Sequence, residues 1–503
     1  MLRLRSVFPI LVAAALGCAT HGPIARTERA RAEARALEHD YLEALVRRYP
    51  GKATVLGVPG AEGTGDDGPA ASAAWREAED AFLFRARTID GRALAGTPEG
   101  IARALLVEAL EGARGVRACR FELWQVSPDG WQALAESQPI GTQERGAEIS
   151  ATVRRIELRI ESLREGVRLG YVATRENVER VLEVLDRLLA DPGTTWPYAL
   201  AAVGDGGDPP PGTELPAASE RELLPAVGRY RDFLREDYLE HARRRPSLLA
   251  LPDGETCYRA AVRQRVTLEL DPQAIHETGL ARVQELHLEM RRVAERSLGT
   301  SDVPDLFRRF PQDPSVGSAA LADAALRGPM NRDAPRSAAP IGDRGPEIAR
   351  VAPTAAFVTG WALYLERLAW ERRSSSDDAE RLRGLAREAL GAARLVVDPG
   401  VNVLGWGREH AIEYLVANAG LSPESAAKEV DRCTARPGEA TASTLGALEI
   451  LRLRSEAERA LGRRFDLRAF HDAVLESGPV TLPLLRERVA RFVRERSAGR
   501  RGR

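Results

Sequence analysis

The sequence predicts a mainly α-helical protein with few or no strands. Apolar residues recur at the three- and four-residue spacing of amphipathic helices over most of the 503 residues. Several of these segments begin with a helix-starting pair, such as Asp271 before Pro272 and Ser422 before Pro423. Strand patterns are weak and short, and the best of them covers residues 121–126.

The first 18 residues are predicted to be a lipoprotein signal peptide. Arg3 and Arg5 precede an apolar run over residues 7–16, which is too short to span a membrane. The run ends in Ala-Leu-Gly-Cys, so Cys18 is the candidate lipidation site and would anchor the protein in a membrane. Ala19, by its resemblance to known sorting signals, favours the outer membrane, on its periplasmic or surface face, over the inner membrane. The alternative is a plain cleaved signal followed by an unmodified cysteine.

The N-terminal lobe of a single large helical domain is expected over residues 36–310, after a tether at residues 19–35. Its first helix has Tyr41, Leu42 and Leu45 on one face and stops at Pro50. The clearest flexible loop is Gly204–Ser219, which is rich in Gly and Pro. The other helices of this lobe are predicted at residues 73–90, 98–112, 143–168, 174–190, 219–245, 256–268 and 272–299.

A Pro- and Gly-rich segment at residues 311–346 separates this lobe from a C-terminal lobe at residues 347–496. In the second lobe, the run Val358–Glu371 places Trp361, Tyr364 and Leu368 on one apolar stripe. A basic tail, residues 497–503, is expected to be solvated. The helices of this lobe are predicted at residues 347–372, 376–397, 407–417, 422–432, 441–461, 466–476 and 481–496.

The composition is that of a folded globular protein, with 44% hydrophobic and 29% charged residues. A formal net charge of -1 argues against a nucleic-acid partner, because no overall positive field attracts phosphates. The mature chain keeps Cys119, Cys257 and Cys433, which allow one disulfide in an exported protein and leave at least one thiol unpaired. The sequence does not choose the pair, and three buried free thiols are the alternative.

Motifs of common enzyme classes are absent from the sequence. There is no His-Glu-x-x-His, no Gly-x-Ser-x-Gly elbow, no phosphate-binding loop and no dinucleotide fingerprint. His276 and His287 are eleven residues apart on one predicted helix, roughly 16 Å along its axis and too far to share an ion. His410 and Glu413 lie on one helix face, where a surface salt bridge explains the pair better than a metal site does.

Ordered segments of the chain closely resemble domain of unknown function family 885, a bacterial family of metallopeptidase-like proteins. The resemblance runs through GWALYLERLAWE, AREALGAARLVVDPGVNVLGWGREHAIEYL, EVDRCTARPGEATASTLGALEILRLRSEAERALG and FDLRAFHDAVLESG. N-terminal segments such as DYLEALVRRYPGKATVLG agree with it, so it covers nearly the whole mature chain. It implies a multi-helix, zincin-like fold of the metallopeptidase type.

Departures from the family pattern fall on its metal motif. Members that resemble active peptidases carry His-Glu-x-x-Pro-Gly-His-His and then a helix beginning Glu-Gly-Trp-Ala-Leu-Tyr. By analogy with zincins, the histidines and the later Glu would hold zinc, and the first Glu would activate water. The corresponding positions of this chain are Asp323 and Ala324 for His-Glu, Pro329 and Met330 for the histidine pair, Thr359 for the later Glu, Asn402 for a usual His, and Cys433 and Ser443 for usual tyrosines.

Packing positions of the family are kept, which is what a catalytically inactive relative would show. We therefore expect no catalytic residue, no metal and no cofactor. The helix from Gly360 is expected to pack against the helix that once carried the metal. A remnant cleft is expected to be lined by Trp361, Tyr364, Glu366, Asp398 and Trp406.

Three hypotheses for function follow. The first is a non-catalytic peptidase homologue, held in the envelope through Cys18, that binds a peptide or an envelope protein. The second is a hydrolase or peptidase with a rebuilt site, whose candidate residues are Asp323, Glu366, Asp398, His410 and Cys433. The third is a purely structural envelope protein. A groove lined by the aromatic residues would favour the first hypothesis, and a filled cleft would favour the third. Convergent carboxylates with shifted pKa values would favour the second.

Overall fold

A computed structural model describes residues 23–50, 52–56, 68–127, 142–190, 219–312, 345–372 and 378–498. The prediction of a mainly α-helical protein is confirmed: over these ranges there is no strand, and one isolated bridge joins Thr174 and Arg243. No helix in the described ranges is long and apolar enough to cross a membrane.

The helices of the N-terminal half are α1 (Pro23–Arg48), α2 (Lys52–Leu56), α3 (Pro69–Thr88), α4 (Pro98–Gly115), η1 (Val116–Cys119), α5 (Phe121–Trp124), α7 (Thr142–Leu169), α8 (Arg175–Ala190), η2 (Ser219–Leu223), α11 (Leu224–Asp232), η3 (Phe233–Tyr238), η4 (Leu248–Ala250), α12 (Gly254–Val266), α13 (Pro272–Leu298) and α14 (Val303–Arg309). Those of the C-terminal half are η6 (Glu347–Arg350), α16 (Ala355–Arg372), α17 (Asp378–Val403), α18 (Arg408–Ala419), α19 (Pro423–Ala435), η7 (Glu439–Thr441), α20 (Ala442–Leu461), η8 (Gly462–Arg464), α21 (Leu467–Leu475) and α22 (Leu482–Ala498).

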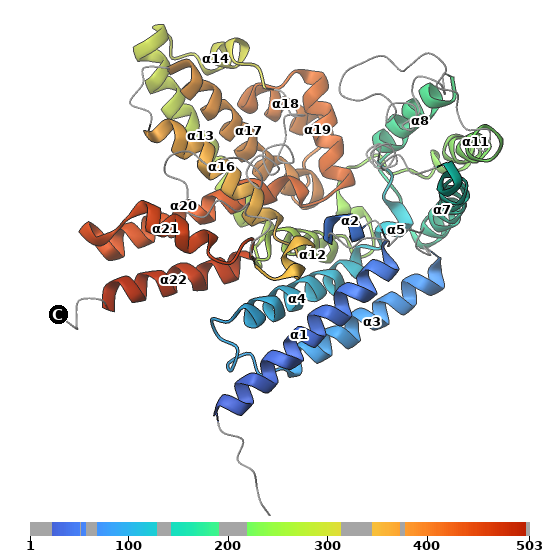
Figure 1. The fold of residues 1–503 in the computed structure, drawn as a ribbon. Coiled ribbons are helices and arrows are strands. Elements are labelled where there is room, and N and C mark those ends of the chain that lie inside the picture. The colour runs from blue at the N-terminus through green and yellow to red at the C-terminus, as the bar shows by residue number, and fades with distance from the viewer. Residues whose placement is uncertain are drawn as a thin grey trace, which may run out of the picture.

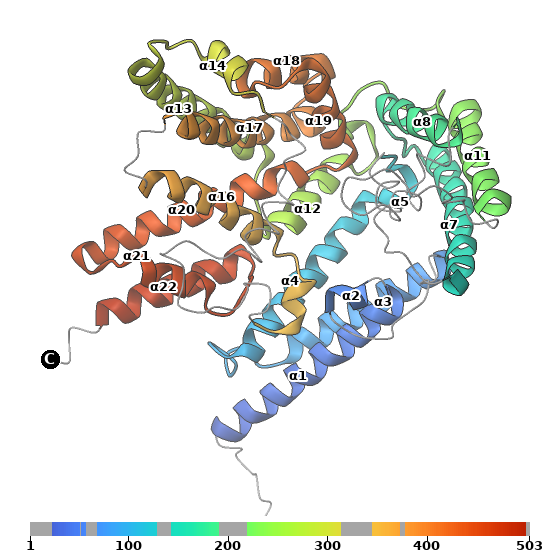
Figure 2. The same cartoon turned by 45° about the horizontal axis from the view of Figure 1, so that its top comes forward.

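Four groups of helices, each around its own buried apolar cluster, make up the molecule (Figure 1). Helices α1, α3 and α4 form one group, and α7, α8 and α11 form a second. The third contains α13, α14 and α17–α19. The fourth brings α12 together with α16 and α20–α22, and the turned view shows α12 between this group and α4 (Figure 2).

The two lobes expected from the sequence share buried apolar clusters, because three of the clusters contain residues from both lobes. Helix α13, from the N-terminal lobe, packs along α17 of the C-terminal lobe, and η6 packs against α4. Gly279 allows the close approach of the first pair, since a Cβ there would lie 2.9 Å from the backbone oxygen of Ala392. Residues 36–310 and 347–496 are therefore not separate packing units.

The predicted tether differs from the structure. Helix α1 begins at Pro23, and its Ala30 and Ala34 are buried at 3% and 2% exposure against the first group of helices. Alanine has the highest helix propensity and leaves room for close helix packing, so this Ala- and Arg-rich stretch folds although it lacks large apolar residues. The part of the predicted tether before Pro23 lies outside the described residues.

The best strand candidate of the sequence, residues 121–126, forms the single helical turn α5 instead. Leu123 and Trp124 are consecutive and both buried, which a strand with alternating faces does not allow. Arg120 precedes the turn with φ of 45° and ends η1, and the Trp124 indole N–H donates to the carbonyl of Cys119 over 2.7 Å.

A disulfide joins Cys119 of η1 to Cys257 of α12, with the Cα atoms 4.5 Å apart. Cys433 is a free, buried thiol. The bridge ties α12, at the centre of the molecule, to the end of the first group of helices.

Candidate functional site

Thr359, which the sequence analysis predicts to stand at the place of a third zinc ligand, lies in the first turns of α16. Its hydroxyl donates to the carbonyl of Ala355 over 2.8 Å. One residue further on, α16 crosses α20 at Gly360 and Gly446, so closely that a Cβ at Gly360 would lie 2.4 Å from the backbone carbon of Gly446. Thr359 is therefore held by its own helix beside a tight crossing, and its hydroxyl has a backbone partner.

The other motif positions, Asp323, Ala324, Pro329 and Met330, lie outside the described residues, as does nearly all of the segment 311–346. The expectation that α16 packs against the former metal-bearing helix stays a prediction for the same reason. Within the described chain, α16 packs chiefly on α20 (Figure 2).

Trp361 and Tyr364 are core residues, which corrects their expected place in an open cleft. Each is 1% exposed. Their rings lie 5.1 Å apart, and both contact the ring of His471 edge-on. Tyr364 Oη and His471 Nε2 share a hydrogen bond of 2.8 Å. These side chains bind α16 to α21 and fill the space that a groove would need.

Asp398 is likewise buried, with no exposed surface, so it does not line an open cleft. The sequence predicted a helix ending at residue 397, but α17 continues through Pro399 to Val403 because its last turn is packed in the core. The Asp398 Oδ1 accepts hydrogen bonds from the Tyr258 hydroxyl at 2.8 Å and the Gly438 N–H at 2.9 Å. Burial raises the pKa of Asp398 to about 7, against the two hydrogen bonds, which lower it.

Asn402 lies one turn after Asp398 and is also fully buried. Its amide donates to the carbonyl oxygens of Asp398 at 2.9 Å and Cys433 at 3.1 Å. Asp398 Oδ2 and Asn402 Oδ1 have no hydrogen-bond partner in the structure. Burial, and then the charge of Asp398, raise the pKa of the Cys433 thiol well above its ordinary value, so this thiol is not a ready nucleophile.

Trp406 and His410 form a separate, partly exposed cluster at the start of α18. Their ring centroids are 4.4 Å apart, and Trp406 also contacts His276 at 5.2 Å and Tyr414 at 5.4 Å. The Nδ1–H of buried His276 donates to the carbonyl of Val396 over 2.9 Å. The exposed His410 thus contacts an aromatic ring, while Asp398 and Cys433 are sealed in the core.

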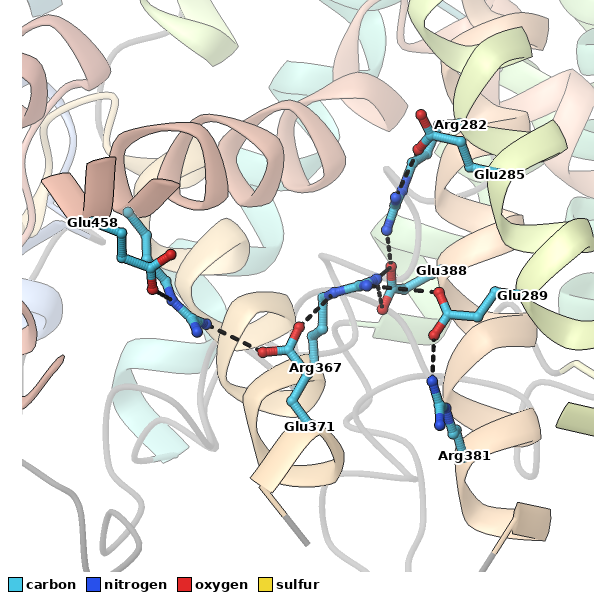
Figure 3. Close-up of polar contacts among 9 residues, drawn as sticks. Arg282, Glu285, Glu289, Arg367, Glu371, Arg381, Glu388 and Glu458 are labelled. Atoms are coloured by element: carbon cyan, nitrogen blue, oxygen red, sulfur yellow. Dashed lines mark hydrogen bonds and ion pairs between the residues drawn. The ribbon is translucent and has the colours of Figure 1, made fainter. Parts of the chain in front are cut away.

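Glu366 belongs to a set of ion pairs between helices. It pairs with Arg387 of α17. Beside this pair, Arg367 of α16 contacts Glu388 of α17 at 2.8 Å and Glu289 of α13 at 3.7 Å (Figure 3). The network continues through further charged residues of α13, α16, α17 and α20, namely Arg282, Glu285, Glu371, Arg381, Arg454 and Glu458.

These positions do not form a typical zinc site. Ser443 is half-buried on α20, and Thr359, Asn402 and Ser443 offer a hydroxyl or an amide where zinc prefers imidazole, thiolate or carboxylate. Over the described ranges, no group of three or more His, Cys, Asp or Glu side chains could hold a metal ion. The described residues at the motif positions therefore do not fit zinc.

Two concave regions are lined by none of the three residues Thr359, Asn402 and Ser443. One, of about 820 Å³, is lined by one face of α13 together with Arg381, and includes Leu288, which is 49% exposed. The other, of about 410 Å³, lies between α5, α7 and α11. No local sequence pattern distinguished either region. The first is a charged face of one helix, which has the pattern of any solvated face, and the second is assembled from residues far apart in the chain.

One family model, described as bacterial protein of unknown function (DUF885), matches residues 50–328 and 337–489. The chain belongs to the DUF885 family. No curated protein matches this DUF885 chain.

Two solved structures share the fold of this DUF885 chain. A candidate lipoprotein from Colwellia psychrerythraea is 19% identical, with a TM-score of 0.73 and coverage of 93% of this chain and 99% of that chain. A candidate lipoprotein of unknown function from Shewanella oneidensis is 15% identical, with a TM-score of 0.62 and coverage of 90% and 98%. At these identities the likeness shows the fold alone.

Proposed function

We propose that this protein is a non-catalytic DUF885 member, held in the cell envelope by a lipid on Cys18, that binds a peptide or protein partner. Its relation to zinc peptidases and a zincin-type fold belong to the same proposal. The main support for this proposal is that the side chains of Thr359 and Asn402, at the described motif positions, form hydrogen bonds to backbone carbonyls within the fold. Thr359 bonds its own helix, and Asn402 bonds the carbonyls of Asp398 and Cys433.

Membrane attachment is supported by the sequence around Cys18 and by the two solved structures, both described as candidate lipoproteins. The Ala19 signal favours the outer membrane within this proposal. The partner surface we favour is the region lined by α13, where exposed Leu288 lies among Arg292, Glu295 and Arg296. An apolar side chain within a charged rim is typical of a protein contact surface.

A rebuilt hydrolase is disfavoured by the positions of its candidate residues. Glu366 is neutralised by Arg387, and His410 lies on the surface against Trp406. Asp398 has the shifted pKa that an acid or base catalyst needs, but it has no exposed surface. Glu429, whose charge also raises that pKa, is itself buried in ion pairs with Arg394 and Arg432. A purely structural role is the second candidate, since Trp361 and Tyr364 fill the core where a groove was expected.

Metal content of the mature chain, residues 19–503, tests the non-catalytic part of the proposal. The protein is incubated with zinc, dialysed and measured by elemental analysis. We expect less than about a tenth of an equivalent, because no described motif position supplies a good ligand. Binding near one equivalent would overturn this part, and substitution of Asp323, Glu366, Asp398 and His410 in turn would then locate the ligands.

Site-specific photocrosslinking tests the partner surface. A photoreactive phenylalanine is placed at Leu288 in cells that carry the lipidated protein, and at Leu249 as a control, which is 54% exposed on η4. A discrete crosslinked product from position 288 but not from 249 is expected. Crosslinks of equal yield at both positions, or at neither, contradict a partner at α13 and favour the structural role.

A further inference from the structure

Five residues on the outer face of α13 form one stripe along the helix. They follow one another at steps of three or four residues, so they lie on the same side of the helix and span roughly 20 Å of its axis. All five line the concave region of about 820 Å³. In chain order, the stripe consists of Arg282, Glu285, Leu288, Arg292 and Glu295.

Leu288 is at the centre of this stripe, and the charges on its two sides have opposite signs. One turn before it is Glu285, and one turn after it is Arg292. Two turns away the order is reversed, with Arg282 before and Glu295 after. Such a stripe is complementary to a second copy that runs in the opposite direction, because each charge then lies opposite its counter-charge and leucine lies opposite leucine. Two copies that run in the same direction would bring like charges together.

Three of the four charges in the stripe are available to a second molecule. The side chains of Arg292 and Glu295 are exposed and form no hydrogen bond or ion pair with any residue that the structure describes. Glu285 contacts Arg282 at 2.9 Å, but its side chain remains 65% exposed. Arg282 is the least available, because it also pairs with Glu388 at 2.7 Å. The pair between Glu285 of one copy and Arg292 of the other is therefore expected to contribute most.

Leu288, which is 49% exposed, gives the stripe an apolar centre within a charged rim. Of the other charged residues in the lining, Glu289 and Arg381 pair with each other at 2.8 Å. Arg296 lies beyond the stripe and donates to the carbonyl of Arg292 at 3.2 Å. In both views α13 lies at the edge of the molecule, where a second copy can approach it (Figure 1, Figure 2).

We propose that α13 is a self-association surface, on which a second copy of this chain binds in an antiparallel, two-fold arrangement centred on Leu288. The inference rests on the function proposed above, because it names the partner of the α13 surface. Glu285 of each copy contacts Arg292 of the other, and the two Leu288 side chains pack together on the axis. One helix face buries little area, so the pair is weak in solution. Attachment of both copies to one membrane by the lipid on Cys18 raises their local concentration and favours the pair.

Trapping by an introduced disulfide tests this arrangement on the purified mature chain. In Leu288→Cys the two new thiols meet on the two-fold axis, whereas Cys433 is buried and Cys119 is already joined to Cys257. Mild oxidation should therefore give a disulfide-linked dimer on a non-reducing gel. Leu249→Cys is the control for random collision, because Leu249 is 54% exposed on η4. The control should be crosslinked at least about tenfold more slowly, since no bound state holds its thiols together.

Charge reversal tests whether the two copies run in opposite directions. In the Leu288→Cys protein, Arg292→Glu places carboxylates opposite each other on both sides of the axis and should slow crosslinking by about tenfold or more. Glu285→Arg should have the same effect, because it places guanidinium groups opposite each other. The two reversals together exchange the charges and should restore crosslinking to within about threefold. Lys428→Glu on α19 makes the same change in net charge as Arg292→Glu and should leave the rate within about twofold.

Circular dichroism confirms that each variant is folded before oxidation. Equal crosslinking of Leu288→Cys and Leu249→Cys overturns the proposal, as does a double reversal that crosslinks as slowly as the single reversals. A photocrosslink from position 288 in cells to a protein of another mass, with no dimer from the purified chain, overturns self-association and keeps α13 as a partner surface. Loss of both signals overturns self-association and the proposed partner surface together.

Discussion

The close crossing of α16 and α20 predicts the effect of Gly446→Ala on stability. Whether this substitution stabilises or destabilises the protein depends on backbone atoms alone. Glycine in a helix interior normally costs about 1 kcal/mol relative to alanine, so Gly→Ala usually stabilises a helix. At Gly446, however, a Cβ would lie 1.8 Å from the carbonyl oxygen of Ala356 and 2.7 Å from its carbonyl carbon. Both obstacles are backbone atoms of the facing helix, so no rotamer change relieves the clash.

Gly446→Ala should therefore destabilise the protein. Carbon and oxygen atoms in contact are normally about 3.3 Å apart or more, so the helices must separate by roughly 1.5 Å at the crossing. Overpacking of this kind typically costs about 1–3 kcal/mol and sometimes more, and the separation also loosens the packing of Phe357 and Ile450. After the gain in helix propensity is subtracted, we expect the free energy of unfolding to fall by about 2 kcal/mol or more.

Urea unfolding, followed by helical circular dichroism, measures this change. Gly228→Ala on α11 is the matched control, because a Cβ at Gly228 meets no atom within 4 Å. The control should be stabilised by about 0.5–1 kcal/mol through propensity alone. If Gly446→Ala matches the control in sign, the two helices do not approach as closely as described and the reasoning fails.

Three further predictions concern buried groups. Because burial raises the pKa of Asp398 from 3.8 to about 7, the stabilising contribution of its carboxyl group is full at low pH and falls as the pH rises from about 4 to about 7. Asp398→Asn should therefore gain stability relative to wild type over that same range, and urea midpoints that run parallel for the two proteins would contradict this. Replacing Cys119 and Cys257 by serine should lower the free energy of unfolding by about 2–5 kcal/mol, and a reductant should destabilise wild type but not this double variant. Arg243→Met should leave the free energy of unfolding unchanged or raise it by about 1–3 kcal/mol, because it removes a buried guanidinium without hydrogen bonds. A loss of similar size in urea unfolding would show that the guanidinium has a partner.

Helix positions were predictable where local signals act within one or two turns. Asp271 accepts a hydrogen bond from the Gln273 N–H at 2.9 Å, and Ser422 accepts one from the Ser425 N–H at 3.1 Å. Both helices begin at the proline that the sequence pointed to. The predicted helix end at residue 397 was wrong, because the core packing around the end of α17 outweighs the local cost of Pro399.

Site chemistry was less predictable because it depends on contacts between distant segments. The sequence marked Asn402 as a departure from the family, but its bond to the carbonyl of Cys433 exists only in the folded chain. Trp361 and Tyr364 have the same apolar spacing whether they line a cleft or fill a core. No sequence signal marked the pairing of Cys119 with Cys257, because the two cysteines are 138 residues apart. None marked the buried guanidinium of Arg243 either, because its lack of a hydrogen-bond partner exists only in the folded chain.

The disulfide between Cys119 and Cys257 can form only late in folding and only in an oxidising compartment. The two cysteines are 138 residues apart, so the bond closes only after α12 has reached the end of the first helical group. Reducing cytoplasm keeps both thiols open, whereas an oxidising compartment closes them. For the exported lipoprotein proposed above, a chain that awaits transport lacks the cross-link at its centre and is easier to keep unfolded. Its arrival in an oxidising compartment then makes the finished fold more durable.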